Sequence, residues 1–404
     1  MGRLVLGIAS TLVCLLVAEL ATRWLLPVPL HTTDTFLHLG DARLRRDESA
    51  PVWLRAGVRT RHQEEDFSVT VAVNSKGLRD REMAYAKPPG VRRLLSVGDS
   101  FAFGYGVELD EAFCKVAAAE LGPPWEAINA GVPSWGTGDE LDFLLTEGFR
   151  YEPDVVVLTC FFENDLRDNW NRQRYTVGAD GRARRVRPLE QDLRERTSFD
   201  GVSVRNPLLK TICERGAPAD ATEPAAPAPP RVSWWIAHSN LARMVRRAIS
   251  RTEYRTREQA MQEAAHRDEA ERRALGAALL TEIARQCRAH DTPLVILLMP
   301  SKKELAWNDG PGFRAAYDDV VAGAEQWGAT IVDLAPPLRE LGIQTAYFGN
   351  DPHINAAGHR AVGHVLARAV RSAWRGRGGP AHPGASGVPP QPGPWFTGVL
   401  GRRR

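Results

Sequence analysis

Short apolar runs and longer amphipathic stretches alternate over much of the chain. Five of the runs have the length and the flanking turn residues of buried strands, at residues 92–97, 125–130, 154–161, 293–299 and 329–334. Segments with helical spacing of their apolar residues follow at residues 137–149, near 313–327 and at about 356–374. Strands that alternate with helices predict an α/β protein built on a mainly parallel sheet, and five strands fit a flavodoxin-like three-layer α/β/α sandwich.

Three regions depart from this alternation. Residues 31–66 are polar and irregular, and a short strand is predicted after them at residues 67–73. Residues 167–260 are rich in Arg and include the low-complexity run 217–230, which predicts a partly disordered insertion. The helix after this insertion presents one apolar face to the sheet, formed by Leu275, Leu279, Leu280, Ile283 and Cys287. The Gly- and Pro-rich residues 376–404 predict a disordered tail, so we expect an extension (31–90), one main domain (91–375) and the tail.

The first residues form the longest apolar segment. No charge occurs in residues 4–18, and residues 4–26, at about 1.5 Å per residue, are long enough to cross a hydrocarbon core of roughly 30 Å. We predict an uncleaved, single-pass membrane anchor in residues 1–30, with the main domain outside the cytoplasm. The alternative is a cleaved signal peptide and a secreted protein, but a cut after Ala21 would place Glu19 where a small residue is required.

Composition narrows the function classes. The 404 residues carry 52 basic and 49 acidic side chains, a net charge of only +3, which argues against a nucleic-acid binder and a polybasic membrane-surface protein. The five cysteines form neither a CxxC pair nor a Cys/His cluster, which argues against a disulfide scaffold and a structural zinc site. No phosphate-binding motif for a nucleotide is present, and we expect neither a metal nor another cofactor.

Candidate chemistry lies where the predicted strands end. In a parallel sheet ligands bind beyond the carboxyl ends of the strands, and polar groups stand there at Gly98-Asp99-Ser100, Asn129-Ala130-Gly131, Asn164-Asp165 and, before the last helix, Asp351-Pro352-His353. A Ser at such a turn can act as a nucleophile, a neutral His can take its proton, and a carboxylate can orient the His. The backbone amides of Ser100 and Gly131 and the side-chain amide of Asn164 are candidate donors to an oxyanion.

Each of these residues also has a purely structural interpretation. Ser100 could cap a helix, Gly131 could allow a tight turn, and Asn164 could bond to its own backbone in a loop. Asp351 could cap the last helix, and His353 could be a surface residue. The convergence of all four groups on one edge of the sheet favours a catalytic site. Three further candidates are expected to be structural or exposed: His359, His364 and Cys160.

Four blocks in this order resemble those of the SGNH, or GDSL-type, hydrolases. They are VGDSF, NAGVPS, the END of residues 163–165 and DPHINAAGH, and the resemblance covers about residues 91–370. It implies the SGNH hydrolase fold, with Ser100 as nucleophile, His353 as general base, and Ser100, Gly131 and Asn164 as the oxyanion hole. The chain is also similar to bacterial proteins that O-acetylate polysaccharides, and this similarity together with the predicted anchor makes acyl transfer a second candidate activity.

Two positions depart from the family pattern. Phe162 stands where the third block usually has a Gly, two residues before the Asn. The usual acid position, three residues before the His, holds Asn350, whereas Asp351 lies two residues before it. We choose Asp351 as the acid because residues i and i+2 of an extended segment point to the same side. Three more residues are candidates for the pocket wall: Asp99, Asp165 and Asn350.

Three functions are compatible with these residues. The first is a serine esterase that removes small acyl groups, acetyl above all, from a carbohydrate or lipid through an acyl-Ser100 intermediate. The second is an O-acyltransferase that uses the same triad and passes the acyl group to an extracytoplasmic polysaccharide. The third is an inactive glycan-binding module, against which the intact Ser100, Asn164 and His353 argue. We expect an acylated carbohydrate or lipid and the membrane as partners, and no nucleic acid.

Overall fold

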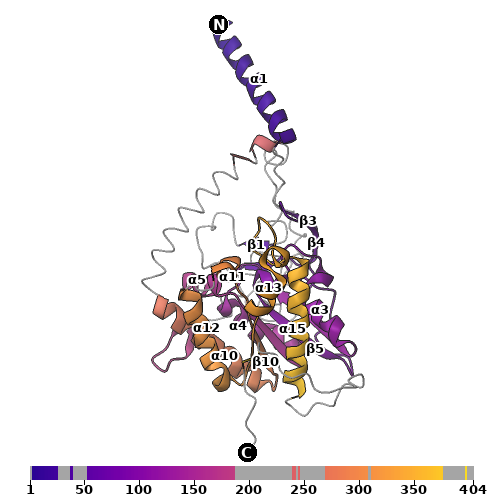
Figure 1. Ribbon diagram of the computed structural model, residues 1–404, viewed down its shortest axis with the longest axis vertical. Helices are drawn as coiled ribbons and strands as arrows, with labels where there is room; N and C mark the ends of the chain where they lie inside the picture. The colour runs from indigo at the N-terminus through magenta and orange to yellow at the C-terminus, as the bar shows by residue number, and fades with distance from the viewer. Residues whose placement is uncertain are drawn as a thin grey trace, which may run out of the picture.

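A parallel sheet forms the centre of the molecule (Figure 1). The computed structural model describes residues 2–25, 37–39, 52–186, 239–242, 244–245, 269–307, 311–375 and 396–397. The parallel strands are β5 (Arg92–Gly98), β6 (Trp125–Gly131), β7 (Val155–Cys160), β10 (Leu294–Leu298) and β11 (Thr330–Asp333). Their order in space, β6-β5-β7-β10-β11, is that of a flavodoxin-like sheet. The predicted α/β fold with five mainly parallel strands is therefore confirmed, and a two-residue strand, β12 (Phe396–Thr397), adds antiparallel to β11.

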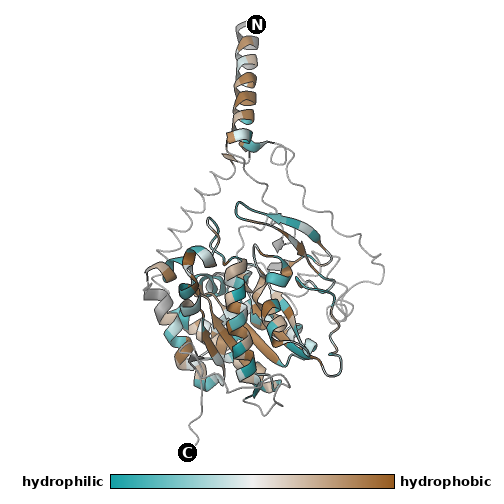
Figure 2. Ribbon diagram, turned by 45° about the vertical axis from the view of Figure 1, so that its right-hand side comes forward, coloured by the Kyte–Doolittle hydropathy of each residue, from teal (hydrophilic) through white to brown (hydrophobic). Residues whose placement is uncertain are grey.

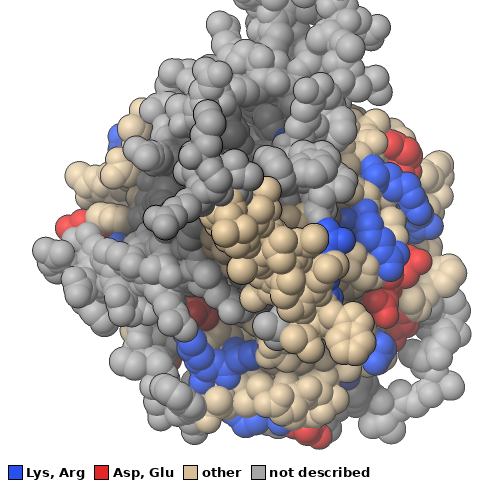
Figure 3. Space-filling view, turned by 90° about the horizontal axis from the view of Figure 1, so that it is seen from above, with Lys and Arg blue, Asp and Glu red and all other residues tan. Residues whose placement is uncertain are grey.

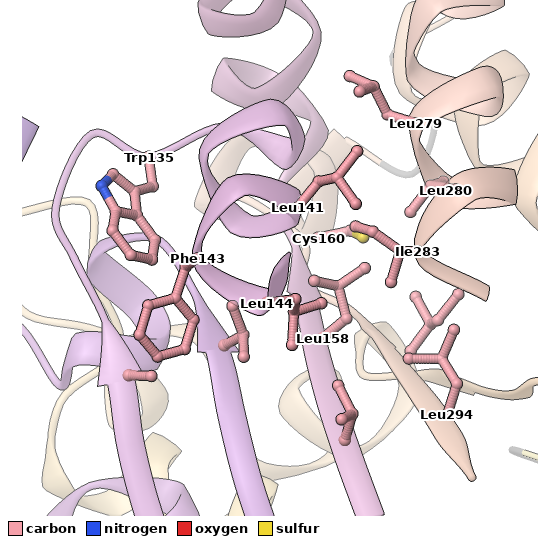
Figure 4. Packing of buried hydrophobic residues seen from close by; sticks show 14 of the residues in the cluster. Trp135, Leu141, Phe143, Leu144, Leu158, Cys160, Leu279, Leu280, Ile283 and Leu294 are labelled. Atoms are coloured by element: carbon pink, nitrogen blue, oxygen red, sulfur yellow. The ribbon is translucent and has the colours of Figure 1, made fainter. Parts of the chain in front are cut away.

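Helices cover both faces of this sheet. One face packs on α4 (Thr137–Thr146), α10 (Glu269–Ala289) and α12 (Pro311–Trp327), and the other on α3 (Phe113–Leu121) and α15 (Ala356–Arg375). Successive strand residues point to opposite faces, so the strands must be apolar at almost every position, and β7 and β10 are buried throughout. Figure 4 shows the first face, where leucines of α4 and α10 meet Leu158 and Cys160 of β7.

Shorter elements connect these layers. They are the helices α2 (Ser100–Phe103), α5 (Phe162–Arg172), α11 (Lys302–Trp307), α13 (Ala335–Leu341) and α14 (Ile343–Ala346), two 3-10 turns (Leu109–Glu111 and Gly148–Tyr151), and the strand pairs β1 (Leu37–Leu39) with β2 (Val52–Leu54), β3 (Arg59–Gln63) with β4 (Ser68–Ala72), and β8 (Tyr175–Val177) with β9 (Ala183–Arg185). The end of α5 and the β8–β9 hairpin occupy the start of the predicted insertion. Most of the remaining insertion and of the predicted tail lies outside the described residues.

The segment before the first sheet strand is more ordered than its polar sequence predicts. Only β4 was predicted there, and its partner β3 was missed because His62 alone of its five side chains is buried. Arg79, also buried, donates hydrogen bonds to the carbonyl oxygens of Phe103 (3.1 Å), Gly104 (2.6 Å) and Val107 (2.6 Å). Burial lowers the pKa of this guanidinium to about 10, which still leaves it charged at neutral pH. One buried cation thus joins this segment to the chain that follows α2.

A buried ion pair lies along the outer edge of β6. Lys115 on α3 contacts Asp80 at 2.6 Å and donates to the carbonyl oxygen of Ala127, also at 2.6 Å. Asp80 in turn accepts a hydrogen bond from the backbone amide of Asn129 at 2.7 Å. Among the described strands β6 is the last of the sheet on this side, so the ion pair satisfies backbone groups that a further strand would otherwise take.

Helix α1 (Gly2–Leu25) extends away from the domain (Figure 2). It exposes apolar side chains, among them Leu12, Leu16 and Leu20. Its last two turns carry the charged side chains of Glu19 and Arg23, which pair at 2.6 Å. Glu19 also accepts a hydrogen bond from the Ser239 hydroxyl at 2.7 Å. Within the described residues no helix combines the length and the hydropathy needed to cross a bilayer. The predicted transmembrane helix is therefore not supported.

Candidate active site

The candidate nucleophile lies where β5 turns into α2. Ser100 is the first residue of α2 and is nearly buried, with 9% of its surface exposed. Gly98 before it has φ +159°, and a Cβ there would come within 2.8 Å of the Cβ of Ala102 and 2.9 Å of the Cβ of Thr159. The side chain of Asp99 caps the turn by accepting a hydrogen bond from the Phe101 amide at 2.9 Å. The sharp turn therefore depends on the glycine and on the aspartate cap.

A complete Ser–His–Asp chain is formed. The Nε2 atom of His353 lies 2.6 Å from the Oγ atom of Ser100, and its Nδ1 atom lies 2.6 Å from the Oδ1 atom of Asp351. The same carboxylate oxygen accepts a hydrogen bond from the backbone amide of His353 at 2.9 Å. The His353 ring stacks on Tyr105, with centroids 4.5 Å apart, and borders Phe101 at 4.9 Å. These contacts hold the imidazole between nucleophile and acid.

Asn350, at the usual acid position of the family, faces away from this chain. Its side-chain amide donates to Asp66 Oδ1 at 2.9 Å, and its backbone amide donates to Asp66 Oδ2 at 2.7 Å. Asp351 is thus the carboxylate that contacts His353, as the i, i+2 argument predicted.

The candidate oxyanion donors have partners inside the protein. Gly131, at the end of β6, donates its amide to the Oδ1 atom of its neighbour Asn129 at 3.0 Å. A Cβ on Gly131 would lie 2.0 Å from the backbone nitrogen of Phe103, so only glycine lets α2 approach β6 this closely. Asn164, in the first turn of α5, donates from Nδ2 to Asp99 Oδ2 at 3.1 Å. An Asn amide has two N–H groups, so the second remains for another acceptor.

Three acidic residues lie buried beneath the site: Asp99, Glu140 and Asp165. Two of them were expected on the pocket wall, but the structure places both in the interior. Asp165 accepts a hydrogen bond from the Phe161 amide at 2.8 Å, whereas neither carboxylate oxygen of Glu140 has a partner among the described residues. Burial, together with mutual repulsion, raises the pKa of Glu140 and Asp165 well above the ordinary range. Burial is also the main reason that the pKa of Asp99 rises to about 6.

The remaining candidates have structural positions. His359 is buried in α15 and accepts a hydrogen bond from the Phe113 amide at 3.2 Å, and burial lowers its pKa to about 3, which keeps the ring neutral. His364 is exposed and contacts Glu120. Cys160 is part of the core, and burial raises the pKa of its thiol. Within the described part of the chain, no group of three His, Cys, Asp or Glu residues could hold a metal ion.

Three residues that lie near the site were not predicted from the sequence: Asp66, Tyr105 and Lys302. Only Lys302 had a positional signal, because it follows β10 at the carboxyl end of the sheet. Asp66 had no positional signal, because it accepts a hydrogen bond from the backbone amide of Asp351, which lies 285 positions later in the chain.

Comparison with known proteins bears on the assignment. Residues 254–387, which include Asp351 and His353, match a family profile described as the SGNH hydrolase-like domain of the acetyltransferase AlgX. No curated protein matches the chain. Among solved structures, the acetylxylan esterase Axe2 of Geobacillus stearothermophilus aligns with 12% identity and a TM-score of 0.37 over 70% of this chain and 95% of its own. A member of the lipolytic G-D-S-L family from Veillonella parvula aligns with 12% identity and a TM-score of 0.35 over 68% and 95%.

The profile match and the site geometry point in the same direction. The matched segment contains Asp351 and His353, and the fold brings them to Ser100 in the GDS block at the end of β5. Residues 254–387 are thus similar to an SGNH hydrolase-like domain, and the geometry of the candidate site agrees with this similarity.

Proposed function

We propose that the chain is a serine esterase that removes small acyl groups, acetyl in the first place, from a carbohydrate or lipid. The observation that carries this proposal is the contact of 2.6 Å between Ser100 Oγ and His353 Nε2, with Asp351 on the opposite ring nitrogen. A hydroxyl held against a neutral imidazole that is oriented by a carboxylate is the arrangement that acyl transfer requires.

The reaction follows from this geometry in two halves. His353 takes the proton of Ser100 as Oγ attacks the ester carbonyl, and Asp351 stabilises the imidazolium that forms. The oxyanion accepts hydrogen bonds from Asn164 and from backbone amides of the α2 turn. The intermediate collapses when His353 returns the proton to the departing alcohol, which leaves an acyl-Ser100. Water then attacks the acyl carbon with His353 as its base, and the free acid and Ser100 are released.

A second function uses the same first half. If a sugar hydroxyl replaces water as the attacking group, the acyl group is passed on and the enzyme is an O-acyltransferase. The match to the domain of an acetyltransferase favours this candidate. Charges do not decide between the two acceptors, because acidic and basic side chains lie side by side on the described surface at the end of the domain that faces α1 (Figure 3).

The test is an assay of the purified full-length chain with a short-chain aryl acetate, with and without an oligosaccharide acceptor. We expect Ser100→Ala and His353→Ala to lower kcat by about 10³-fold or more and to abolish acyl-enzyme formation seen by mass spectrometry. Exposed Ser68→Ala and His364→Ala are matched controls that should keep the wild-type rate. A wild-type chain that binds an oligosaccharide but forms no acyl-enzyme would indicate the inactive binding module. Acetylated oligosaccharide among the products would identify the transferase.

A further inference from the structure

The loop that carries the acid and the base has little regular structure of its own. Residues 348–353 connect α14 to α15 and are closed by a single bridge between Tyr347 and Ile354. One more backbone bond, from the Phe348 amide to the His353 carbonyl oxygen at 3.1 Å, crosses the loop. Yet the loop must hold Asp351 within 2.6 Å of the His353 ring. The rest of its backbone is held by two charged side chains from outside.

The first of these side chains is Asp66, in the turn between β3 and β4. Its Oδ2 atom accepts hydrogen bonds from the backbone amides of Asn350 and Asp351, both at 2.7 Å, and its Oδ1 atom accepts from the Asn350 side chain. Partial burial would raise the pKa of this carboxyl, but these hydrogen bonds and the nearby charge of Lys302 lower it below its ordinary value. Asp66 is therefore an anion that accepts hydrogen bonds from three N–H groups of the loop.

The second side chain is Lys302, at the start of α11. Its ammonium group donates to the carbonyl oxygens of Phe348, of Gly349 at 3.2 Å and of Asp351 at 2.7 Å. Asp351 is thus held through its amide by Asp66 and through its carbonyl by Lys302. Because both backbone groups of the acid are fixed, its side chain can turn only about its own torsions.

Apolar contacts keep the β3–β4 turn against the same loop. Phe67, next to Asp66, lies 5.2 Å from the ring of Phe348 and 5.6 Å from the ring of Tyr105, which itself stacks on His353. The hairpin is located at the end of the domain that faces α1 (Figure 1). The hairpin, which lies outside the α/β core, is therefore connected to His353 through the ring of Tyr105.

We propose that Asp66 and Lys302 are positioning residues that clamp residues 348–353 between them and so set the geometry of the Asp351–His353 pair. This rests on the proposed acyl transfer through Ser100, in which the pair must be aligned before the proton moves. Neither residue contacts the reacting atoms. Their effect is therefore on kcat, through the orientation of His353, and not on the binding of a small ester.

The key comparison is between Asp66→Ala and Asp66→Asn. Ala removes all three hydrogen bonds, and we expect kcat for the aryl acetate to fall by about 10- to 100-fold, as for a misplacement of roughly 1 Å, with KM little changed. Asn can keep the bonds, because its Oδ1 can accept from both backbone amides while the Asn350 amide turns over to accept from Nδ2. We expect the kcat of Asp66→Asn for the aryl acetate to stay within about threefold of the wild-type value. Exposed Glu65→Ala, in the same turn, is the control.

Lys302→Met separates positioning from simple electrostatics. Loss of a nearby cation alone would stabilise the imidazolium and speed the reaction, whereas loss of the clamp slows it, as in Asp66→Ala. We expect a slower reaction, and Lys303→Met, at the exposed neighbour, should leave the rate unchanged. A faster Lys302→Met, or an Asp66→Asn as slow as Asp66→Ala, would overturn the proposal.

A measurement without substrate keeps this test independent of the proposed function. We expect a downfield proton NMR signal from the Nδ1–H of His353 that bonds to Asp351, absent in His353→Ala. This signal should be broadened or lost in Asp66→Ala and retained in Asp66→Asn. If the wild type turns over no ester, the proposed function fails, but the NMR comparison still decides on the clamp. An unchanged Nδ1–H signal in Asp66→Ala would contradict the proposal that Asp66 positions the Asp351–His353 pair.

Discussion

At the scale of single residues, the position of the acid is the main departure from the family pattern. Asp351 holds His353, while Asn350, at the usual acid position, bonds to Asp66 instead. At the position where the SGNH pattern usually has its acid, this chain thus has a residue that bonds to Asp66.

This assignment predicts different outcomes for the two neighbours. Asp351→Asn leaves an amide that can no longer stabilise the imidazolium, so we expect kcat to fall by about 10³- to 10⁴-fold. Asn350→Ala removes one hydrogen bond to Asp66 and keeps both backbone bonds, so we expect a loss of about tenfold or less. Steady-state kinetics with an aryl acetate measures both. If Asn350→Ala proves the more damaging, the acid has been misassigned.

Residues of the site differ in how far the sequence predicts them. Ser100, Asn164 and His353 belong to short blocks whose order is recognisable, and Asp351 follows from a local spacing argument. Glu140 gave no such signal because it is one of three acidic residues in a helix of mixed pattern. Asp66 bonds to a backbone amide 285 positions later in the chain, and Lys302 bonds to a carbonyl oxygen 49 positions later. Only the folded chain therefore reveals the role of either residue.

At the scale of elements, the buried strands were the easiest to predict, because in a parallel sheet both faces must be apolar. The hairpin β3–β4 was only half predicted, since β3 buries a single side chain. Helix α5 was missed because its sequence, FENDLRDNWNR, is strongly polar, and its place is set by tertiary packing against α10.

Helix α4 carries the buried Glu140, which has a consequence for stability. In the unfolded chain the carboxyls of Glu140 and its neighbours Asp99 and Asp165 lose their protons near pH 4. The fold raises all three pKa values, that of Asp99 to about 6. The folded state therefore binds more protons in this range, so this cluster makes the protein less stable as the pH rises above about 4.

Glu140→Gln should reduce that loss, because an amide of the same shape has no proton to lose when the unfolded chain ionises. We expect the variant to be more stable than the wild type at pH 8 and nearly equal to it at pH 4. Urea unfolding at both pH values is the measurement, with exposed Glu340→Gln as the control. Equal destabilisation at both values would argue that Glu140 has an unseen partner.

At the scale of the whole molecule, the segment of residues 52–90 belongs to the same folded unit as the candidate site. Asp66 holds the loop of the acid, Arg79 holds the chain after the nucleophile helix, and Asp80 pairs with Lys115 beside β6. The family resemblance begins only at about residue 91, so the block pattern alone underestimates what the fold needs.

A pair of truncations tests this dependence. A chain that begins at residue 51 keeps all three contacts, and we expect cooperative unfolding and an aryl acetate rate near that of the full chain. A chain that begins at residue 91 leaves Lys115 and several buried carbonyl groups without partners, at roughly 1–3 kcal/mol each, so we expect it to be unfolded or insoluble. Circular dichroism and the ester assay measure both. A folded, active chain from residue 91 would show that the segment is dispensable.

The Asp80–Lys115 pair also affects association between copies of the protein at the edge of the sheet. Because the ion pair occupies the amide of Asn129 and the carbonyl of Ala127, the outer strand β6 offers a neighbouring molecule few backbone groups to bond with. Loss of either charge would free those groups on a strand whose side chains are almost entirely apolar or buried. We therefore expect a protein that lacks either charge to associate strand to strand more readily in concentrated solution than the wild type.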